Sequence, residues 1–314
     1  MKIVSLFSGC GGLDLGFKNA GFDIIWANDI FIDAAKTYET NIGKHINTQS
    51  ITHIGVEEIP DCDGVIGGFP CQGFSVANMG RTVDDKRNTL YLEFVRIVKG
   101  KSPKFFIAEN VKGILTLGKG AVFQKIRDDF SSAGYEVFHH LFNVADYGVP
   151  QKRERVILFG IRRDCLKHVT LKFPPIETHS KSPDGRENIK KWVSCGDALS
   201  DIPEPSDESN LPNHSGSKYK LRFNGYLGHR KIDPAEPAPT ITARGDDKGG
   251  VVIIHHPNNQ RRMTVRETAT IQSFPIDFVF EGTNTSAYRQ IGNAVPPLFA
   301  KHLAESVRQS FRDN

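Results

Sequence analysis

Cysteine is scarce in this 314-residue sequence: there are five, at positions 10, 62, 71, 165 and 195, and none forms a Cys-x-x-Cys pair. An odd number of widely spaced cysteines argues against a disulfide framework and against a cysteine-based zinc site. We therefore expect a protein without a bound metal, in a reducing, cytoplasmic environment.

Long apolar runs and a strong excess of one charge are also missing. The N-terminal MKIVSLFSGCGG has one lysine and a short apolar stretch that soon ends in glycines. That stretch is too short for a signal peptide or a membrane span. The net charge is only +4, so overall charge alone does not indicate a nucleic-acid partner. These features predict a globular protein that makes no use of a membrane.

The first half of the chain alternates between strand-like and helix-like segments. Strands are predicted at 2–6, 23–27, 63–67, 104–108, 137–142 and 155–161, and helices at 13–19, 32–41, 89–99 and 121–133. Strand and helix repeated in this order predict an α/β fold, with a mainly parallel sheet covered by helices on both faces.

The composition changes near Phe173. From there to about Gly282 the chain is rich in Pro, Ser, Asn, Asp, Gly and His, with little helical periodicity. We predict a smaller, loop-rich domain over 176–284, and a larger domain formed by 1–175 together with 285–314. Residues 297–311 read as an amphipathic helix that returns to the larger domain.

Charge is unevenly spread over the smaller region. Residues 209–263 contain nine Lys/Arg and four Asp/Glu, whereas 177–208 contain four and eight. The basic part could meet phosphates, although a solvated surface is an equally simple interpretation. The basic side chains in question are Arg222, Arg230, Lys231, Arg244, Lys248, Arg261 and Arg262.

The glycine turn FSGCGGLDLGF follows the first predicted strand and opens a helix. Such glycines let the backbone approach a ligand, and Asp29, at the end of the next strand, could bind a ribose. The dinucleotide pattern G-x-G-x-x-G fails because Asp14 stands at the third glycine. This favours a nucleoside cofactor without a pyrophosphate, such as S-adenosylmethionine, over a nicotinamide or flavin. A purely structural turn is the alternative.

Cys71 lies in GGFPCQGFS, at the carboxyl end of the third predicted strand. Open α/β sheets bind their ligands at this edge, and the glycines and Pro70 favour a constrained loop that holds a nucleophile out of the core. The strand 104–108 delivers Glu109 to the same edge, and QKRER delivers Arg153 and Arg155. We expect the other four cysteines to be small buried hydrophobic residues.

Six blocks of the chain resemble, in order, those of the DNA (cytosine-5) methyltransferases of bacterial restriction–modification systems. They are FSGCGG (7–12), GGFPCQGFS (67–75), AENVKG (108–113), DYGVPQKRERV (146–156), RRMTVRETATIQSFP (261–275) and QIGNAVP (290–296). A lone Pro-Cys-Gln would mean little, but six ordered blocks are highly specific. The resemblance implies a Rossmann-like, S-adenosylmethionine-dependent methyltransferase domain with a smaller target-recognition domain.

The resemblance also implies a mechanism. Cytosine C5 is a poor nucleophile, and a thiolate added at C6 makes C5 reactive toward the methyl group of S-adenosylmethionine. Cys71 is implied as that nucleophile and Glu109 as the group that neutralises charge at the N3 edge of the base. Arg155 would hold the O2 oxygen, and Arg153 would support the same pocket.

For the cofactor, the resemblance implies a pocket built from the glycine turn, the ends of two strands and the C-terminal block. Its residues are Phe7, Gly9, Gly11, Gly12, Asp29, Ile30, Ser50, Ile51, Pro70, Leu90, Asn293 and Val295. Three positions depart from the family pattern: Ser50 replaces an aspartate that holds the adenine, Phe69 replaces a proline, and Thr270 replaces a common arginine.

The target base is unreachable inside a duplex and must be flipped out, which gives the second domain a role in gripping double-stranded DNA. The DNA-binding candidates are Gln72, Ser75, Arg222, Arg230, Lys231, Thr240, Thr242 and Arg244. We expect a monomer on DNA, paired functionally with a separate cognate restriction endonuclease. An RNA (tRNA) cytosine-5 methyltransferase and a catalytically silent DNA-binding protein are the alternatives.

Overall fold

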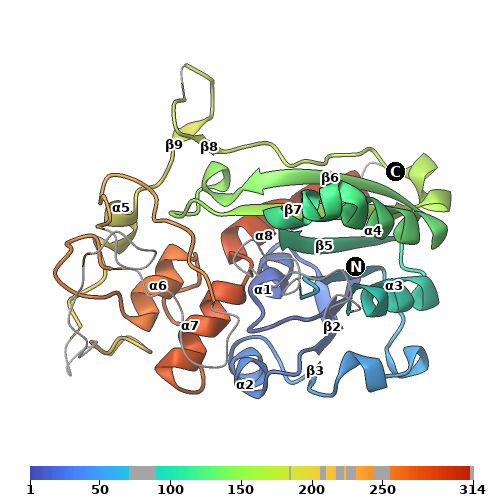
Figure 1. Ribbon diagram of the computed structural model, residues 1–314, viewed down its shortest axis with the longest axis horizontal. Coiled ribbons are helices and arrows are strands. Elements are labelled where there is room, and N and C mark those ends of the chain that lie inside the picture. The colour runs from blue at the N-terminus through green and yellow to red at the C-terminus, as the bar shows by residue number, and fades with distance from the viewer. Residues whose placement is uncertain are drawn as a thin grey trace.

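The computed structural model describes residues 1–70, 90–183, 185–205, 210–216, 223, 231–243 and 255–311. A seven-stranded sheet and its helices form one side of the molecule, and helices α5, α6 and α7 gather on the other (Figure 1). Cys71, Gln72, Ser75, Arg222, Arg230, Arg244 and Lys248 lie outside the described residues.

The sheet is mainly parallel, as predicted. Its strand order is β3 (Ile46–Asn47), β2 (Asp23–Asn28), β1 (Lys2–Leu6), β4 (Gly64–Gly67), β5 (Phe105–Val111), β7 (Glu154–Arg162) and β6 (Tyr135–Asn143). The first five are parallel, and β7 is antiparallel to both β5 and β6. The carboxyl ends of the parallel strands therefore meet at one edge, where the start of β7 joins them.

Helices cover both faces of the sheet because successive strand residues point to opposite sides. On β5, Phe105 and Ile107 belong to a core formed with α1 (Gly12–Asn19) and α8 (Pro297–Ser310). Phe106 and Ala108 belong to a second core, formed with α3 (Leu90–Lys101) and α4 (Ala121–Ser132). Each buried aromatic ring contributes about 1.5–3 kcal/mol to stability.

The C-terminal helix returns to the first domain, as predicted. α8 packs along α1 so closely that a Cβ added at Gly16 would lie 2.6 Å from the backbone carbon of Ala300. The helix that follows α1 in the chain, α2 (Ile32–Asn41), is also bonded to a C-terminal segment. Its Asn41 side chain donates to the carbonyl oxygen of Val279, before α7 (Asn284–Asn293), at 2.8 Å.

The remaining elements are short. They are the parallel pair β8 (His179–Ser180) and β9 (Lys190–Lys191), which projects from the body in Figure 1, and the helices α5 (Cys195–Leu199) and α6 (Val265–Ile271). No separate element was predicted for β3 or α6, because two residues or two turns carry little periodicity, and the ten-residue helix α7 was not predicted either. Within the part of the chain that is described, no helix is long and apolar enough to cross a membrane.

Candidate active site

The glycine turn after β1 adopts a left-handed backbone at three positions. Phe7, Gly9 and Gly11 have φ angles of 55°, 56° and 87°. Such angles carry little strain in glycine but are strained in Phe7. A Cβ at Gly12 would collide with the carbonyl oxygen of Val295, so this glycine lets the C-terminal block approach the turn.

Asp29 closes the turn from the end of β2. Its Oδ2 accepts the amide of Gly9 and its Oδ1 accepts the amide of Phe31, both at 2.8 Å. Burial raises the pKa of Asp29, and the two amides and nearby Arg289 oppose that shift. The next residue, Ile30, is 66% exposed, as expected for a residue that has room to contact a ligand.

Asp14, which breaks the dinucleotide pattern, is fully buried under the turn. Its carboxyl accepts hydrogen bonds from Ser5 Oγ at 2.7 Å and Tyr38 Oη at 2.8 Å. Burial raises its pKa to about 6, although both hydroxyls oppose that shift. Asp14 therefore joins β1, α1 and α2 beneath the turn and does not face the ligand side.

The remaining predicted cofactor residues are distributed around the same edge. Ser50 pairs its hydroxyl with Thr52 Oγ1 at 2.8 Å, and Ile51 is buried beside it. Leu90 begins α3, Asn293 is exposed at the end of α7, and Val295 is buried. The structure brings these positions and the glycine turn to one edge.

Phe69 explains one departure from the family pattern. Its ring is buried and packs against Tyr91 and Phe94 of α3, with centroids 6.2 and 6.0 Å away. Its carbonyl oxygen accepts a hydrogen bond of 3.4 Å from Asn110 Nδ2. The segment that leads through Pro70 to Cys71 is thus anchored to the sheet edge by a ring where the family has a proline.

The four described cysteines are free, and none is presented as a nucleophile. Cys10 and Cys195 are buried, and Cys62 and Cys165 are partly buried. Burial raises the pKa of Cys62 to about 12 and that of Cys195 to about 11, and it raises the pKa of Cys10 further. These thiols stay protonated at neutral pH, as expected for small hydrophobic residues.

Glu109 and Arg155 form an ion pair at the carboxyl edge of the sheet. Arg155 Nε lies 2.6 Å from Glu109 Oε1, and the two side chains are only 12% and 13% exposed. Burial lowers the pKa of Arg155, and Glu109 opposes that shift. A Cβ at Gly68 would lie 2.9 Å from Glu109 Oε2, so the segment before Cys71 passes directly beside this carboxylate.

Arg153 is placed differently from Arg155. It is 1% exposed and donates to three backbone carbonyls: Ile241 at 2.7 Å, Gly292 at 2.9 Å and Ala294 at 3.1 Å. Its guanidinium therefore connects the start of β7 to the Thr-Ile-Thr segment and to the C-terminal block. Burial, together with the nearby charge of Arg155, lowers its pKa, and the three carbonyl oxygens stabilise the buried guanidinium by accepting its hydrogen bonds.

The Thr240-Ile241-Thr242 segment lies along the loop before β7. Thr240 Oγ1 donates to the carbonyl of Lys152 at 2.6 Å, and the Lys152 amide donates to Ala238 at 2.8 Å. A Cβ at Gly292 would lie 2.5 Å from the amide nitrogen of Ala243, so α7 also approaches this segment closely.

Two of the basic residues that could meet phosphates are placed differently. Arg261, a candidate for phosphate contact, donates to both carboxylate oxygens of buried Glu267 at 2.8 and 2.6 Å and to Glu204 at 2.7 Å. It therefore ties α6 to the preceding segment instead. Lys231, by contrast, is exposed, with its ammonium group 5.8 Å from the ring centroid of Phe223.

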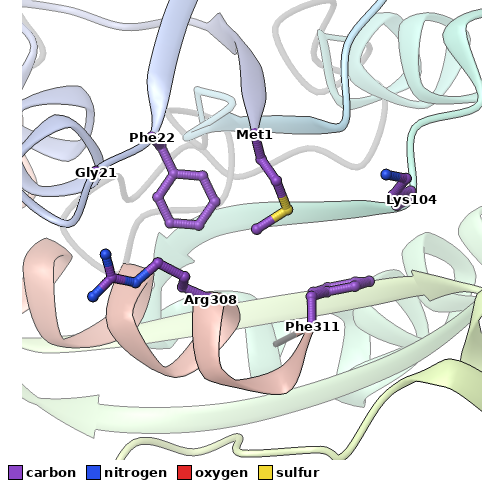
Figure 2. A pocket seen from close by; sticks show the side chains of 6 residues that line it. All are labelled: Met1, Gly21, Phe22, Lys104, Arg308 and Phe311. Carbon is purple, nitrogen blue, oxygen red and sulfur yellow. The ribbon is translucent and has the colours of Figure 1, made fainter. Parts of the chain in front are cut away.

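A cavity of about 340 Å³ lies at the opposite edge of the sheet (Figure 2). It is lined by Met1, Gly21, Phe22, Lys104, Arg308 and Phe311, which stand before β1, β2 and β5 or near the end of α8. It is therefore remote from Glu109 and Arg155. Among the described residues, no group of three or more His, Cys, Asp or Glu side chains could hold a metal ion.

The whole chain can now be compared with known proteins. A family model for C-5 cytosine-specific DNA methylases matches residues 1–309. This chain belongs to that family. The methylase is 40% identical to the Type II methyltransferase M.NgoFVII of Neisseria gonorrhoeae over 339 residues, covering 100% of this chain and 88% of the relative. M.MthTI of Methanothermobacter thermautotrophicus is 37% identical, with 98% of this chain and 97% of the relative covered.

Solved structures agree on the fold of the methylase. A crystal structure described as a DNA modification methyltransferase encoded within an E. coli prophage superposes with a TM-score of 0.79 at 26% identity, covering 100% of both chains. The S. pombe Dnmt2 methyltransferase shares the fold, with a TM-score of 0.68 at 20% identity over 96% of this chain and 97% of that one. The family and fold predicted from the six sequence blocks are confirmed.

Two glutamines of the methylase were not singled out from the sequence. Gln151 and Gln272 are fully buried and hydrogen-bonded to each other. Both stand inside the quoted family blocks. Val149, near Gln151, and Ile271, beside Gln272, are buried in the core. A glutamine at such a position must find buried partners, and that requirement was the signal available.

Proposed function

We propose that this methylase transfers a methyl group to C5 of a cytosine flipped out of duplex DNA. The observation that carries the proposal is the ion pair between Glu109 and Arg155, 2.6 Å long and largely shielded, at the edge where the segment toward Cys71 arrives. An acid and a guanidinium placed together can bind the polar edge of a pyrimidine on the same side as a thiol.

The chain's own groups divide the chemistry. Cys71, as thiolate, adds to C6 and leaves electron density at C5. Glu109 in its protonated form donates to N3 and neutralises the charge that develops there, while Arg155 donates to O2. C5 would then take the methyl group of S-adenosylmethionine, which would leave as the uncharged thioether. A water can accept the C5 proton, and cleavage of the C6–sulfur bond releases Cys71 as the thiolate and restores the aromatic ring. Arg153 supports this pocket by holding the backbone around it.

We assign the cofactor site to the glycine turn and the end of β2. A Cβ at Gly9 would meet no atom within 4 Å, so this turn borders open space beside Asp29, as a bound nucleoside requires. S-adenosylmethionine supplies a methyl group activated by its sulfonium charge. Each Asp29 oxygen retains a lone pair for a ribose hydroxyl, beyond the amide that it already accepts.

The other predicted residues complete this assignment. Phe7, Gly11 and Gly12 would surround the methionine part. Ile30, Ser50, Ile51, Pro70 and Leu90 would line the nucleoside side, and Asn293 and Val295 would close the pocket from the C-terminal block. Ser50 can hold the adenine less strongly than the family's aspartate, because its hydroxyl is shared with Thr52.

We assign target recognition to residues 176–284 and the chemistry to 1–175 with 285–314. Thr240 bonds the loop that carries Arg153, immediately before Arg155 in β7, Thr242 follows two residues later, and Lys231 is exposed. With Gln72, Ser75, Arg222, Arg230 and Arg244 they are the proposed DNA contacts. The Type II relatives support a restriction–modification role. We place that role in the cytoplasm, with a separate endonuclease as partner and a monomer acting on DNA.

The test is expression in cells that lack DNA methylation, followed by bisulfite sequencing. We expect one short sequence context to be methylated at cytosine C5. Purified protein given labelled cofactor should methylate duplex DNA and not total tRNA. Methylation of tRNA alone would establish the RNA alternative, and no methylation of either would establish a silent binding protein.

A further inference from the structure

We propose that Gln151 is a positioning residue that couples target recognition to catalysis. The inference rests on the proposed function and concerns how the recognition segment communicates with the Glu109–Arg155 pair. Gln151 lies in the loop before β7, four residues from Arg155, and its side chain is fully buried.

The amide of Gln151 joins two parts of the molecule. Its Oε1 accepts the backbone amide of Ile241 at 3.0 Å, and its Nε2 donates to Gln272 Oε1. Gln272, at the end of α6, donates in turn to the carbonyls of Ala294 at 2.7 Å and Ile291 at 3.2 Å. One side chain thus connects the Thr-Ile-Thr segment to the junction between α6 and the C-terminal block.

The backbone carbonyl of Ile241 is hydrogen-bonded as well. It accepts from the guanidinium of Arg153, two residues beyond Gln151, at 2.7 Å. Gln151, Arg153 and Gln272 thus form a buried polar cluster with the backbone of Ile241. Outside this cluster, Thr240 Oγ1 donates to the carbonyl of Lys152 at 2.6 Å. The recognition segment is therefore attached to three successive residues, and β7 begins immediately after them at Glu154.

This arrangement makes the position of Ile241 matter to Arg155. The cluster is buried, so water cannot replace Ile241 as a partner if the recognition segment shifts. A shift caused by a wrong base pair would break the bond to Gln151 or displace the loop before β7 together with Arg155. One lost buried hydrogen bond corresponds to about a tenfold effect on an equilibrium. Discrimination between sequences should therefore act on kcat as well as on DNA binding.

The test is kinetic and uses the full chain with Gln151→Met, which keeps the side chain's approximate volume but removes both hydrogen bonds. kcat and KM for DNA are measured on a duplex with the recognition sequence, found by bisulfite sequencing, and on duplexes with one base pair changed. Gln124→Met is the matched control, because Gln124 is exposed on α4 and bonds only Asp128 there.

In the wild type, a changed base pair should lower kcat. In Gln151→Met, kcat on the recognition sequence should fall about tenfold. The further loss caused by the base change should nearly vanish, since the coupling bond is already absent. Cofactor affinity should stay within about twofold of the wild type, and Gln124→Met should behave like the wild type. A loosened fold would instead lower cofactor affinity. It would leave unchanged the ratio of kcat on the recognition sequence to kcat on the duplex with one base pair changed.

Two results would overturn the proposal. In the first, a base change lowers kcat by the same factor in the wild type and in Gln151→Met. In the second, a base change alters only KM for DNA in the wild type. If Gln151→Met does not fold, Thr240→Val, which removes the partly exposed bond to Lys152, should reduce the kcat penalty in the same direction. A wild-type protein that methylates no DNA would contradict the proposed function itself, and so the two failures are distinguishable.

Discussion

The sheet domain and the region between residues 176 and 283 are held together in different ways. In the sheet domain, alternating strand residues divide between two apolar cores, and each core is closed by helices with one apolar face. In the other region, a third apolar core around α6 and α7 is supplemented by polar side chains that bond backbone groups of other segments. Arg266 donates to the carbonyls of Pro212 and Pro275, and Asn259 exchanges hydrogen bonds with the backbone of Ile232.

The difference shows how one chain can combine a fixed reaction with an adaptable specificity. An apolar core tolerates little change in volume, so it holds the carboxyl edge of the sheet in place. In the other region, loops that individual side-chain hydrogen bonds attach to the apolar core can change while those few bonds are kept. The proposed function assigns chemistry to the first region and recognition to the second, and each prediction below tests that division.

The largest effect is expected from Cys71→Ser. The substitution should lower methyl transfer by about a thousandfold or more, because a hydroxyl is a far weaker nucleophile than a thiolate. DNA affinity, measured by fluorescence anisotropy on the same duplex, should change little. Equal loss of binding and turnover would mean that Cys71 belongs to recognition and would contradict the division.

The two neighbouring arginines should separate stability from chemistry. Arg153→Leu leaves the carbonyls of Ile241 and Gly292 without this donor, takes one of two donors from Ala294, and should lower the free energy of unfolding by about 3–5 kcal/mol. Arg155→Leu breaks a largely buried ion pair and should also cost about 3–5 kcal/mol, but it removes the guanidinium proposed to bind the base and should lower kcat far more than Arg153→Leu does. Urea unfolding and steady-state kinetics on both variants measure this contrast, and equal losses of kcat would count against it.

Asp14 provides a test by pH within the sheet domain. Its pKa of about 6, against an ordinary 3.8, means that the folded state holds this proton more tightly than the unfolded state. The contribution of Asp14 to wild-type stability should therefore fall as pH rises from about 4 to 6, and this loss should be complete above that window. Asp14→Asn lacks this loss, so its stability relative to the wild type should rise by on the order of 3 kcal/mol across the window. Urea unfolding at several pH values measures this, with the exposed Asp128→Asn as control. If Asp14 were not buried as described, the difference in unfolding free energy between Asp14→Asn and the wild type would not change with pH.

The smallest effect is expected where the two regions touch. Gly292→Ala places a Cβ 2.5 Å from the backbone of Ala243, so α7 or the recognition segment must move, at about 1–2 kcal/mol. Gly216→Ala, in the region 176–284, meets only an ordinary contact with Pro205 among the described residues and should be neutral. Thermal unfolding of the pair measures this; equal behaviour of the two variants would show that the close approach is not required.

The sequence predicted the sheet domain well because burial there follows simple periods. The strand 104–108 and the helix 121–133 both carry apolar residues at the spacing of their element, and the structure confirms both within a few residues at each end. The carboxyl edge also brings Glu109 and Arg155 together as expected, since strand ends meet there by topology.

The rest could not be predicted, because it depends on single long-range hydrogen bonds. Nothing in the sequence distinguishes Arg153, bonded to three carbonyls, from Arg155, bonded to a carboxylate, although they stand two residues apart. Arg261 similarly counted as a basic residue facing solvent, whereas its partner Glu267 stands in the next helix. Composition and charge counts do not carry such pairings.

The central claim is that Cys71 bonds to the target base, and trapping with 5-fluorocytosine tests it most directly. Fluorine at C5 prevents the step that releases the thiol, so a duplex carrying 5-fluorocytosine in the recognition sequence should form a stable complex with the methylase. Mass spectrometry of peptides should place the linkage on Cys71, and Cys71→Ser should form none. An active preparation that yields no adduct, or one attached to another residue, would contradict the account.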